Sequence, residues 1–302
     1  MQNWKKEGLI YTCRHDGTLP FYAAVPFVKQ LKGNHVRIYY SGRNLLNQSV
    51  TLYFDYDIET RKILTDNGRI LLKPEKPGAF DDAGTVLFQI VSYKDEHFLF
   101  YSGWTLEVQV PFRFTIGIAK SKSDDKDFLR ISDGPVVGQT IFDPYMAGAP
   151  AVIIENGIWK MWYITCTKWM IENGVAKHYY LIKYTESQDG IHWFNERSTA
   201  IDFKNDEEFA IARPVVIREE NIYKMWYSYR GNYYKIGYAE SQDGITWKRK
   251  DEEIKMDVSD TGWDSEMVCY GFIFDHNNKR YMVYNGNGYG KSGIGLAVLE
   301  NK

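Results

Sequence analysis

The sequence has little of what marks several common protein classes. Its three cysteines, Cys13, Cys166 and Cys269, lie far apart and form no CxxC pair, which argues against a zinc site or a disulfide framework. No apolar run is long enough to span a membrane, and the N-terminus lacks the apolar stretch of a secretion signal. The formal net charge is only −2, so the charge balance indicates neither a nucleic acid nor a membrane surface as partner. We therefore expect a cytoplasmic protein with no membrane insertion and no nucleic-acid partner.

Aromatic residues, by contrast, are plentiful. They make up 16% of the chain, with 23 tyrosines and 9 tryptophans. Aromatic and β-branched side chains favour the half-buried faces of strands, and no stretch has a convincing amphipathic helix pattern. The composition therefore indicates an all-β protein with aromatic side chains to spare for stacking on a ligand.

A decapeptide occurs twice in the chain. Residues 184–193 read YTESQDGIHW and residues 238–247 read YAESQDGITW. Each copy ends a longer unit made of an apolar run, a short turn, an aromatic run ending in MWY, a variable loop and an alternating run. Fainter copies of this unit occupy the rest of the chain. The third run of each unit begins at Val50, Ile116, Ile182, Ile236 and Ile294, so the units recur every 54 to 66 residues.

Four antiparallel strands repeated at this interval describe the blade of a propeller. We therefore predict an all-β fold, a five-bladed β-propeller that forms a single domain over residues 1–302. The predicted blades are 18–72, 79–140, 143–203, 206–256 and 262–300, and the last is completed by the N-terminal strand 8–13. This closure leaves no open edge between the first blade and the last.

The antiparallel order assigns the turns to two faces of the molecule. The SQDG turns lie on the lower, outer side, where Asp-Gly suits a tight turn. We therefore interpret Asp189 and Asp243 as turn residues without a catalytic role, and expect Trp193 and Trp247 to pack between blades. The segments that enter the inner strands and the loops that leave the second strands gather on the opposite, upper face. These segments do not repeat, and a site is usually built on such variable segments.

Charged residues are concentrated in these upper segments. The carboxylates are Asp16, Asp81, Asp82, Asp143, Glu207, Glu208, Asp264 and Glu266, and the arginines are Arg14, Arg43, Arg213 and Arg230. Buried charge is costly unless it is paired, so this crowding needs an explanation. One explanation is a binding or catalytic funnel on the propeller axis. The other is a set of structural acid–arginine pairs that close the top of the barrel.

The unit PxVI…MWYS…KIGYAESxDGIxW resembles the blade pattern of the five-bladed propeller glycosidases, over nearly the whole chain. That superfamily includes arabinanases, β-xylosidases, invertases, levansucrases and mannoside phosphorylases. The chain also resembles propellers that are joined to some glycosyltransferases. The pattern is fairly specific for the architecture and poorly specific for the substrate.

The resemblance implies catalytic carboxylates that project into the axial funnel from the entries of the inner strands. The matching positions here are Asp82, Asp143, Glu208 and either Asp264 or Glu266. The stretch FYAAVPF at the first inner strand lacks the Asp that such glycosidases usually carry, and Asp16 in RHDG is the substitute.

Breaking a glycosidic bond needs an acid at the leaving oxygen and a carboxylate that attacks or activates water. We predict Glu208 as the acid, with Arg213 nearby to orient a hydroxyl or a phosphate. We predict Asp82 as the base, with Asp16 as its substitute, while Glu266 and Asp264 hold sugar hydroxyls or tune the acid. The other predicted binding residues are Arg14, His15, Arg43, Asp81, Asp143 and Arg230, with Trp104 and Trp169 as stacking surfaces for sugar rings.

The arginines favour an anionic ligand, because the guanidinium group matches phosphate oxygens. A sugar phosphate, a nucleotide sugar or an acidic glycan fits this better than a neutral polysaccharide. His15 is the only histidine expected on the upper face, and no spacing indicates metal ligands. The stretch GNGYG joins two strands and opens no helix, so it is not a phosphate-binding loop. We expect neither a metal nor a cofactor.

Two hypotheses about function remain. The first is a glycoside hydrolase-like enzyme that cleaves a glycosidic or sugar-phosphate bond with water or phosphate, in intracellular glycan or nucleotide-sugar metabolism. The second is a non-catalytic propeller that binds a carbohydrate or nucleotide sugar in polysaccharide biosynthesis, with a glycosyltransferase as the expected partner. The number and placement of the carboxylates favour the first, and the missing Asp of the first blade favours the second.

Overall fold

The computed structural model describes residues 1–13, 21–65, 69–122, 127–194 and 197–300. It is all-β, as predicted, with only two short 3₁₀ turns, η1 (Asp251–Glu253) and η2 (Asn287–Gly290). None of the helices in these ranges is long and apolar enough to cross a lipid bilayer.

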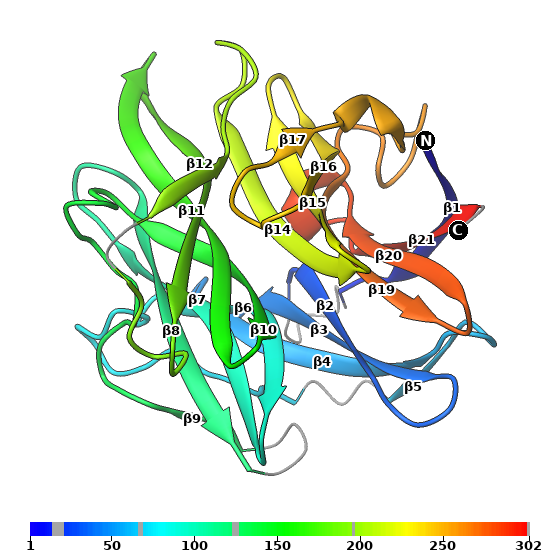
Figure 1. Ribbon diagram of the computed structural model, residues 1–302, viewed down its shortest axis with the longest axis horizontal. Helices are drawn as coiled ribbons and strands as arrows, with labels where there is room; N and C mark the ends of the chain where they lie inside the picture. Colours follow the sequence, from blue (N-terminus) through cyan, green and yellow to red (C-terminus); the bar gives the residue numbers. More distant parts are fainter. Residues whose placement is uncertain (14–20, 66–68, 123–126, 195–196, 301–302) are drawn as a thin grey trace.

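The strands form consecutive antiparallel units that match the sequence repeats (Figure 1). The first unit holds β2 (Ala24–Gln30), β3 (His35–Arg43), β4 (Ser49–Asp57) and β5 (Lys62–Thr65). The second holds β6 (Gly84–Tyr93), β7 (Glu96–Leu106), β8 (Phe112–Ser121) and β9 (Leu129–Arg130). The third holds β10 (Ala147–Glu155), β11 (Ile158–Glu172), β12 (Val175–Ser187) and β13 (Ser198–Ile201). The fourth holds β14 (Ala210–Glu219), β15 (Ile222–Arg230), β16 (Tyr234–Ser241) and β17 (Lys248–Arg249).

The fifth unit joins the two ends of the chain. It holds β19 (Cys269–His276), β20 (Lys279–Asn285) and β21 (Ile294–Glu300), and β1 (Gln2–Tyr11) pairs antiparallel with β21. The short β18 (Ile254–Lys255) pairs with the other edge of β1. The N-terminal strand therefore lies where the sequence predicts it, although it begins at Gln2 and ends at Tyr11 instead of covering 8–13.

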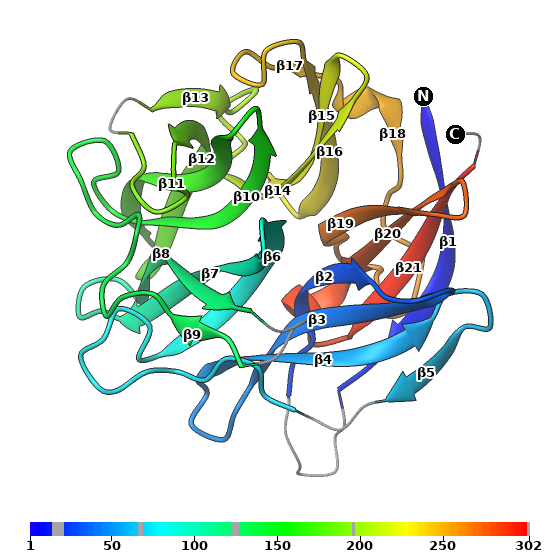
Figure 2. The ribbon, with the colours of Figure 1, turned by 60° about the horizontal axis from the view of Figure 1, so that its bottom comes forward.

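The units are arranged radially, with β2, β6, β10, β14 and β19 nearest the common centre (Figure 2). Neighbouring units bury their apolar faces against one another. Trp226 of β15 and Tyr284 of β20, for example, share one cluster with Trp4 of β1. Because each unit is covered by its two neighbours, the core is a set of interfaces between sheets.

The repeated decapeptide is architectural, as predicted. The Ser187 hydroxyl accepts the amide of Gly190, and Asp189 accepts the amides of Ile191 and His192, and the second copy has the same bonds. The Trp162 indole of the third unit donates to the carbonyl of Gly244 in the turn of the fourth (2.7 Å). Trp247 packs edge-on against the same Trp162 ring, and Trp193 packs against Phe100 of the second unit. The turns and their tryptophans therefore fasten neighbouring units together.

Every inner strand carries a bulge near the centre of the molecule. The register shifts lie at Ala24/Phe27, Leu87/Gln89, Gly148/Ala151, Ala212/Val215 and Cys269/Phe272. In four of these strands the bulge includes a non-glycine residue with positive φ, namely Val25, Ala149, Arg213 and Tyr270. A bulge leaves one residue without a ladder partner and re-aims its side chain. The repeat thus presents one irregular position per unit to the axis.

Candidate functional site

A cavity of about 670 Å³ lies where the five units meet. The inner strands contribute to its lining what we call the floor residues, which are Val25, Phe88, Ala149, Arg213 and Tyr270. More exposed positions in or next to loops provide the mouth residues Arg43, Arg230, Tyr289 and Lys291. The loops that leave second strands therefore contribute to a site, as the sequence predicts, and all five units share in it.

The floor is fixed by bonds between neighbouring units. The amide of Val25 donates to Asn285, that of Ala149 to Ser102, and that of Tyr270 to Ser228. Each acceptor is a second-strand side chain of the preceding unit, with distances from 2.7 to 2.9 Å. Because the bulge leaves these amides without ladder partners, the side-chain acceptors satisfy them. The floor is thus a rigid part of the framework.

Arg213 is the only charged floor residue, and its side chain is almost fully buried, at 2% exposure. Its Nη1 donates to the carbonyl of Phe88 (2.9 Å) and its Nη2 to the carbonyl of Pro26 (2.8 Å), so it reaches across to the first two units. Its Nε has no hydrogen-bond partner, and no acid among the described residues forms an ion pair with it. Burial lowers the pKa of Arg213 to about 9.

The mouth cations lie on aromatic rings. The Arg43 guanidinium is 4.7 Å from the ring centroid of Trp104, and burial lowers the pKa of Arg43. Arg230 donates to the hydroxyl of Tyr289 (2.8 Å), and Lys291 lies 5.6 Å from the ring centroid of Tyr22. These contacts hold the cations in place and leave their charge without an acidic partner among the described lining residues.

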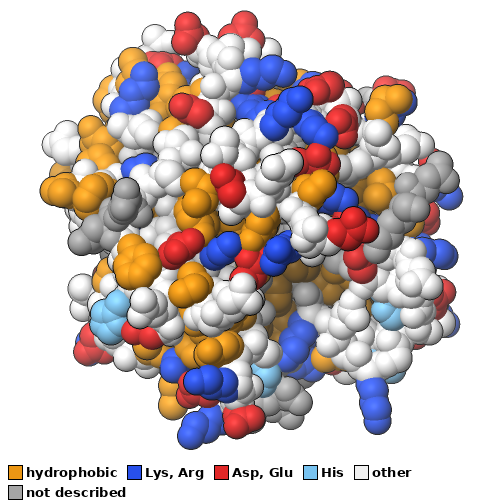
Figure 3. Space-filling view, viewed as in Figure 1, with side chains coloured by type: hydrophobic (Ala, Val, Ile, Leu, Met, Phe, Trp, Pro, Cys, Tyr) orange, Lys and Arg blue, Asp and Glu red, His pale blue; other side chains and the backbone are white. Residues whose placement is uncertain are grey.

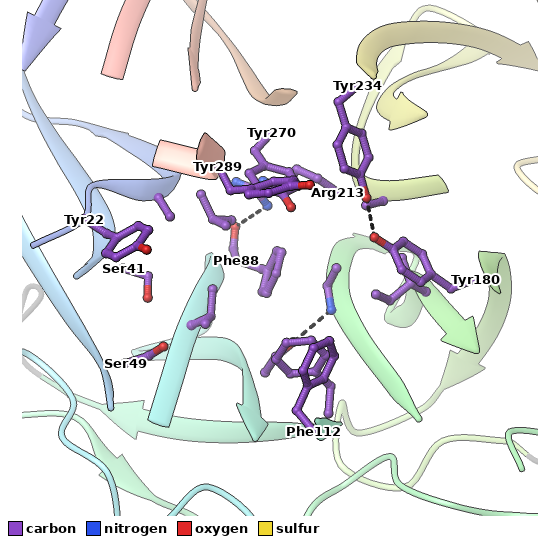
Figure 4. A pocket seen from close by; sticks show the side chains of 18 of the residues that line it. Tyr22, Ser41, Ser49, Phe88, Phe112, Tyr180, Arg213, Tyr234, Tyr270 and Tyr289 are labelled. Atoms are coloured by element: carbon purple, nitrogen blue, oxygen red, sulfur yellow. Dashed lines mark hydrogen bonds between the residues drawn. The ribbon is translucent and has the colours of Figure 1, made fainter. Parts of the chain in front are cut away.

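The wall between floor and mouth is aromatic. The hydroxyls of Tyr180 and Tyr234 are hydrogen-bonded to each other and point toward one another in Figure 4. The ring of His178 stacks on Tyr180 at 4.9 Å, and its Nδ1 is buried without a partner. Burial, with a contribution from the charge of Arg230, lowers the pKa of His178 to about 4. The wall is therefore uncharged at neutral pH, with Phe112 as a further ring in it.

Four of the predicted site carboxylates do not line this cavity. These four acids lie within the units, in what we call clamps. In each clamp, an acid at the entry of the inner strand meets a base from the outer part of the same unit. The acids are Asp81, Asp143, Glu208 and Asp264. The pairs are Asp81 with Arg130 (2.8 Å), Asp143 with Arg197, Glu208 with Arg249 (2.7 Å) and Asp264 with Lys6 (2.8 Å).

A tyrosine from the second strand completes the clamps. Tyr101, Tyr163 and Tyr284 donate to Asp81, Asp143 and Asp264, and Tyr227 donates to Asp251, which shares Arg249 with Glu208. The tyrosine ring passes over a third-strand glycine, because a Cβ at Gly117 or Gly237 would overlap Tyr101 or Tyr227. Of the two explanations that the sequence leaves open, structural pairing therefore holds for these four acids, although the basic partners differ from those expected.

The clamp geometry gives two of the predicted site residues partners other than those expected. Glu208 is the predicted catalytic acid with Arg213 beside it, but both Glu208 oxygens accept from Arg249, and Arg213 bonds to Phe88 and Pro26. Burial raises the pKa of Asp81, which is enclosed by its partners and not presented to a substrate. The side chains of the four clamp acids are thus directed to partners within their own unit and do not line the axial cavity.

The other predicted side chains lie around the cavity without lining it. Asp82 accepts the amide of Gly78 (2.9 Å), and Glu266 is exposed, with its amide bonded to Asn287. Trp104 supports Arg43 from behind and donates to Ser49 (3.1 Å), while Trp169 packs against His178 at 5.0 Å. Both tryptophans therefore support the site from behind its surface.

The predicted residues Arg14, His15 and Asp16 lie outside the described residues. Of the predicted arginines, Arg43, Arg213 and Arg230 all line the cavity. His178 also lines it, so the expectation that His15 would be the only histidine on this face is wrong. Within the described ranges, no group of His, Cys, Asp and Glu could hold a metal ion.

Several lining residues are not among those predicted from the sequence, although the sequence holds two signals for the lining. The floor residues Val25, Ala149 and Arg213 each precede a proline near the start of an inner strand, and proline tolerates the missing ladder bond of a bulge. Tyr180 and Tyr234 are the second residues of YY pairs at the same point of their units. The missed lining residues include Tyr22, Ser49, Phe88, Phe112, His178, Tyr180, Tyr234, Tyr270, Tyr289 and Lys291.

The charge of the cavity differs from that of the outer surface. On the face in Figure 3, acidic and basic side chains are interspersed. The described cavity lining instead has three arginines, one lysine and no carboxylate. An enclosed space that is lined by cations attracts an anion. Its aromatic wall offers flat apolar surface to the rest of a ligand.

Comparisons with known proteins agree on the fold. Solved structures with similar folds include a BT0996 RGII complex (TM-score 0.74, 15% identity, 99% of this protein and 91% of that one). A thermostable family-43 glycoside hydrolase has a TM-score of 0.68 at 16% identity, covering 96% of this protein and 91% of that one. The endo-arabinase of Bacteroides thetaiotaomicron has a TM-score of 0.65 at 15% identity, covering 94% and 98%. These neighbours are glycoside hydrolases of the arabinanase type, whose fold is a five-bladed β-propeller.

No protein-family model matches the chain. At the level of sequence, it is similar to the "Uncharacterized protein Rv1502" of Mycobacterium tuberculosis strain H37Rv, with 38% identity over 302 residues and 99% of both proteins covered. The counterpart in strain CDC 1551, "Uncharacterized protein MT1551", has the same identity and coverage.

Proposed function

We propose that the protein binds an anionic carbohydrate in its axial cavity and cleaves a glycosidic or sugar-phosphate bond of that carbohydrate. The chain belongs to the same family as the protein Rv1502 of Mycobacterium tuberculosis. The five units are, in this proposal, the blades of a five-bladed propeller that β1 closes. The ligand class is a sugar that carries phosphate or carboxylate, free or as part of a larger glycan.

The observation that carries the proposal is the buried charge of Arg213. This guanidinium, at 2% exposure, donates to two carbonyls and lacks the counter-charge that buried ions normally have. A bound anion would supply that counter-charge. The mouth cations Arg43, Arg230 and Lys291 line the same cavity and add to its attraction for an anion.

The neutral wall suits the sugar part of such a ligand. Sugar rings have apolar C–H faces, which pack on rings such as those of Phe112 and Tyr180. The unpartnered Nδ1 of His178 and the hydroxyl pair of Tyr180 and Tyr234 can hydrogen-bond to sugar hydroxyls. The low pKa of His178 keeps it uncharged for this role at neutral pH.

For the chemical step, the cation-rich lining favours phosphate over water as the attacking group. Water needs a carboxylate base to activate it, whereas phosphate already carries the negative charge and is held by guanidinium groups. A proton donor is still needed at the leaving oxygen. Asp16, predicted from the sequence as the substitute base for Asp82, stays a prediction in that role. The catalytic roles predicted for Asp82 and Glu266 stay predictions that no contact in the cavity supports.

A proton NMR time course of anomeric signals tests this proposal. Purified protein is mixed with pools of sugar phosphates, nucleotide sugars and acidic oligosaccharides, with and without inorganic phosphate. Loss of one anomeric doublet and growth of another, dependent on phosphate, is the expected result. Arg213→Met should abolish it, while Arg218→Met, on the exposed end of the same strand, should not. Absence of both conversion and binding for every pool would refute the proposal.

A second candidate is a non-catalytic binding module, which is favoured by the lack of a carboxylate in the described lining. In the same experiment it predicts line broadening of one ligand without any conversion. The cytoplasmic location, a role in polysaccharide biosynthesis and a glycosyltransferase partner stay predictions from the sequence.

A further inference from the structure

Arg213 lines the cavity, and the framework leaves its buried Nε without a partner. The guanidinium crosses the axis and is held at its two terminal nitrogens by the carbonyls of Phe88 and Pro26. The Phe88 ring lies on one side at 5.1 Å and that of Phe272 lies at 5.4 Å. The group is therefore fixed in position, while its Nε–H has no hydrogen-bond partner. A buried unsatisfied donor on a charged group is costly, so it calls for a partner outside the chain.

The backbone at Arg213 is strained as well. Its φ is +54°, and equivalent bulges place Val25, Ala149 and Tyr270 in the same left-handed region. Such a conformation is strained for a non-glycine residue and persists where the surroundings enforce it, often at ligand sites. The bulge is common to the framework, but only the fourth unit puts a charge on it. The repeat therefore accounts for the bulge but not for the charged residue that occupies it in the fourth unit.

The cavity holds its cations at two depths. Arg213 is buried at the floor, whereas Arg43 and Arg230 are half-buried and Lys291 is exposed at the mouth. The aromatic wall lies between these levels. The guanidinium of Arg213 is anchored on the carbonyls of Phe88 and Pro26 and is almost fully buried. A group that reaches it must therefore be the end of a ligand, because a group in the middle of a ligand has substituents on both sides.

We propose that the floor of the cavity is a socket for a terminal phosphate group of a sugar, and that the ligand enters phosphate first. This inference rests on the proposed function, of which it specifies the ligand. The phosphate pairs with the guanidinium of Arg213, the sugar ring lies against Phe112 and Tyr180, and the mouth cations neutralise the rest of the negative charge. A phosphate monoester fits better than a diphosphate linkage, because only the monoester has a free end. It also fits better than a carboxylate, because its two charges match more of the surrounding cations.

Isothermal titration calorimetry of the unaltered protein tests this inference with four probes: a hexose 6-phosphate, the free hexose, the matching hexuronic acid and the UDP-hexose. Charge-assisted hydrogen bonds contribute about 1.5–3 kcal/mol, so the hexose 6-phosphate should bind about 10- to 100-fold more tightly than the free hexose. It should also bind at least about tenfold more tightly than the UDP-hexose, whose diphosphate is capped at both ends. Binding of the UDP-hexose at the same affinity as the monoester would overturn the terminal position. Stronger binding of the hexuronic acid would overturn phosphate as the group.

The variants Arg213→Met and Arg218→Met locate the phosphate. Arg213→Met should bring the affinity for the hexose 6-phosphate down to that for the free hexose, and Arg218→Met should leave both unchanged. If Arg213→Met does not fold, the ¹⁵Nε–H resonance of Arg213 in the unaltered protein replaces it, and it should shift on addition of the hexose 6-phosphate but not of the free hexose. An unchanged resonance would overturn the socket. Failure of all probes to bind would instead count against the proposed function itself.

Discussion

The clamps within the units and the axial cavity both bury charged side chains, but only the clamps match each acid with a base. Asp143, fully buried, is paired with Arg197 and lies 3.6 Å from Lys183. Arg213, equally buried, has two carbonyls and no acid. Removing one partner of a buried pair leaves an uncompensated charge, whereas an unpaired charge is already uncompensated. Loss of a charge should therefore lower the stability much more in a clamp than in the cavity, and this difference separates structural charge from binding charge.

The largest effect is expected in a clamp. Asp143→Ala would leave Arg197 and Lys183 without their acid and Tyr163 without an acceptor. Breaking a buried pair costs about 3–5 kcal/mol, and we expect a loss of this size in the free energy of unfolding, measured by urea denaturation. The double variant Asp143→Ala with Arg197→Met should recover part of it, because the stranded charge is gone. A loss below about 1 kcal/mol would show that the clamp is only a surface pair.

This comparison also shows what the sequence could and could not predict. The repeat predicted the units and the joining of the two ends, because turn and strand rules act in the same way in each copy. The direction of a side chain at a strand entry was not predictable, because a shift of one residue turns it from the axis into the sheet. Asp81 lies in a clamp, and its neighbour Asp82 bonds to the amide of Gly78 outside it. The bulges decide what faces the axis, and in three of the five inner strands a proline marks the bulge in the sequence, whereas the other two bulges contain no proline.

A smaller effect is expected for the stability of the Arg213→Met variant. The substitution removes two hydrogen bonds of the guanidinium but also the cost of burying an unpaired charge, so the free energy of unfolding should stay within about 2 kcal/mol of the unaltered protein. A destabilisation as large as that of Asp143→Ala would mean that Arg213 is itself a structural group.

The pH dependence of that stability sharpens the test. The folded pKa of Arg213, about 9, lies below its ordinary value of 12.5, so above pH 9 the unfolded state retains a proton that the folded state has lost. The free energy of unfolding should therefore rise with pH in this window, by up to about 1.4 kcal/mol per pH unit. The increase should appear in the difference between the unaltered protein and Arg213→Met, since both share the tyrosines that also titrate there. A flat difference from about pH 8 to about pH 11 would contradict the buried, unpaired state of the charge.

The smallest effect concerns His178, a base that the cavity keeps neutral without any acid nearby. Burial is the main cause of its pKa of about 4, and the charge of Arg230 adds to it. Because this pKa is below the ordinary 6.5, the protein should lose stability through His178 as the pH falls from about 6.5 through 4. NMR titration of the ring should give a midpoint near 4, and Arg230→Met should raise it while leaving it below 6.5.

A bound anion should act on His178 in the opposite direction to Arg230. A hexose 6-phosphate in the cavity brings negative charge close to the ring and should raise the midpoint, while the free hexose should not. The exposed His192, paired with Asp189 in the turn of the third unit, serves as the control in the same spectra and should not respond to either sugar. A midpoint that both sugars move equally would mean that only the burial of the ring has changed. A midpoint that only the phosphate moves would place the negative charge inside the cavity, whose described lining has cations and no carboxylate.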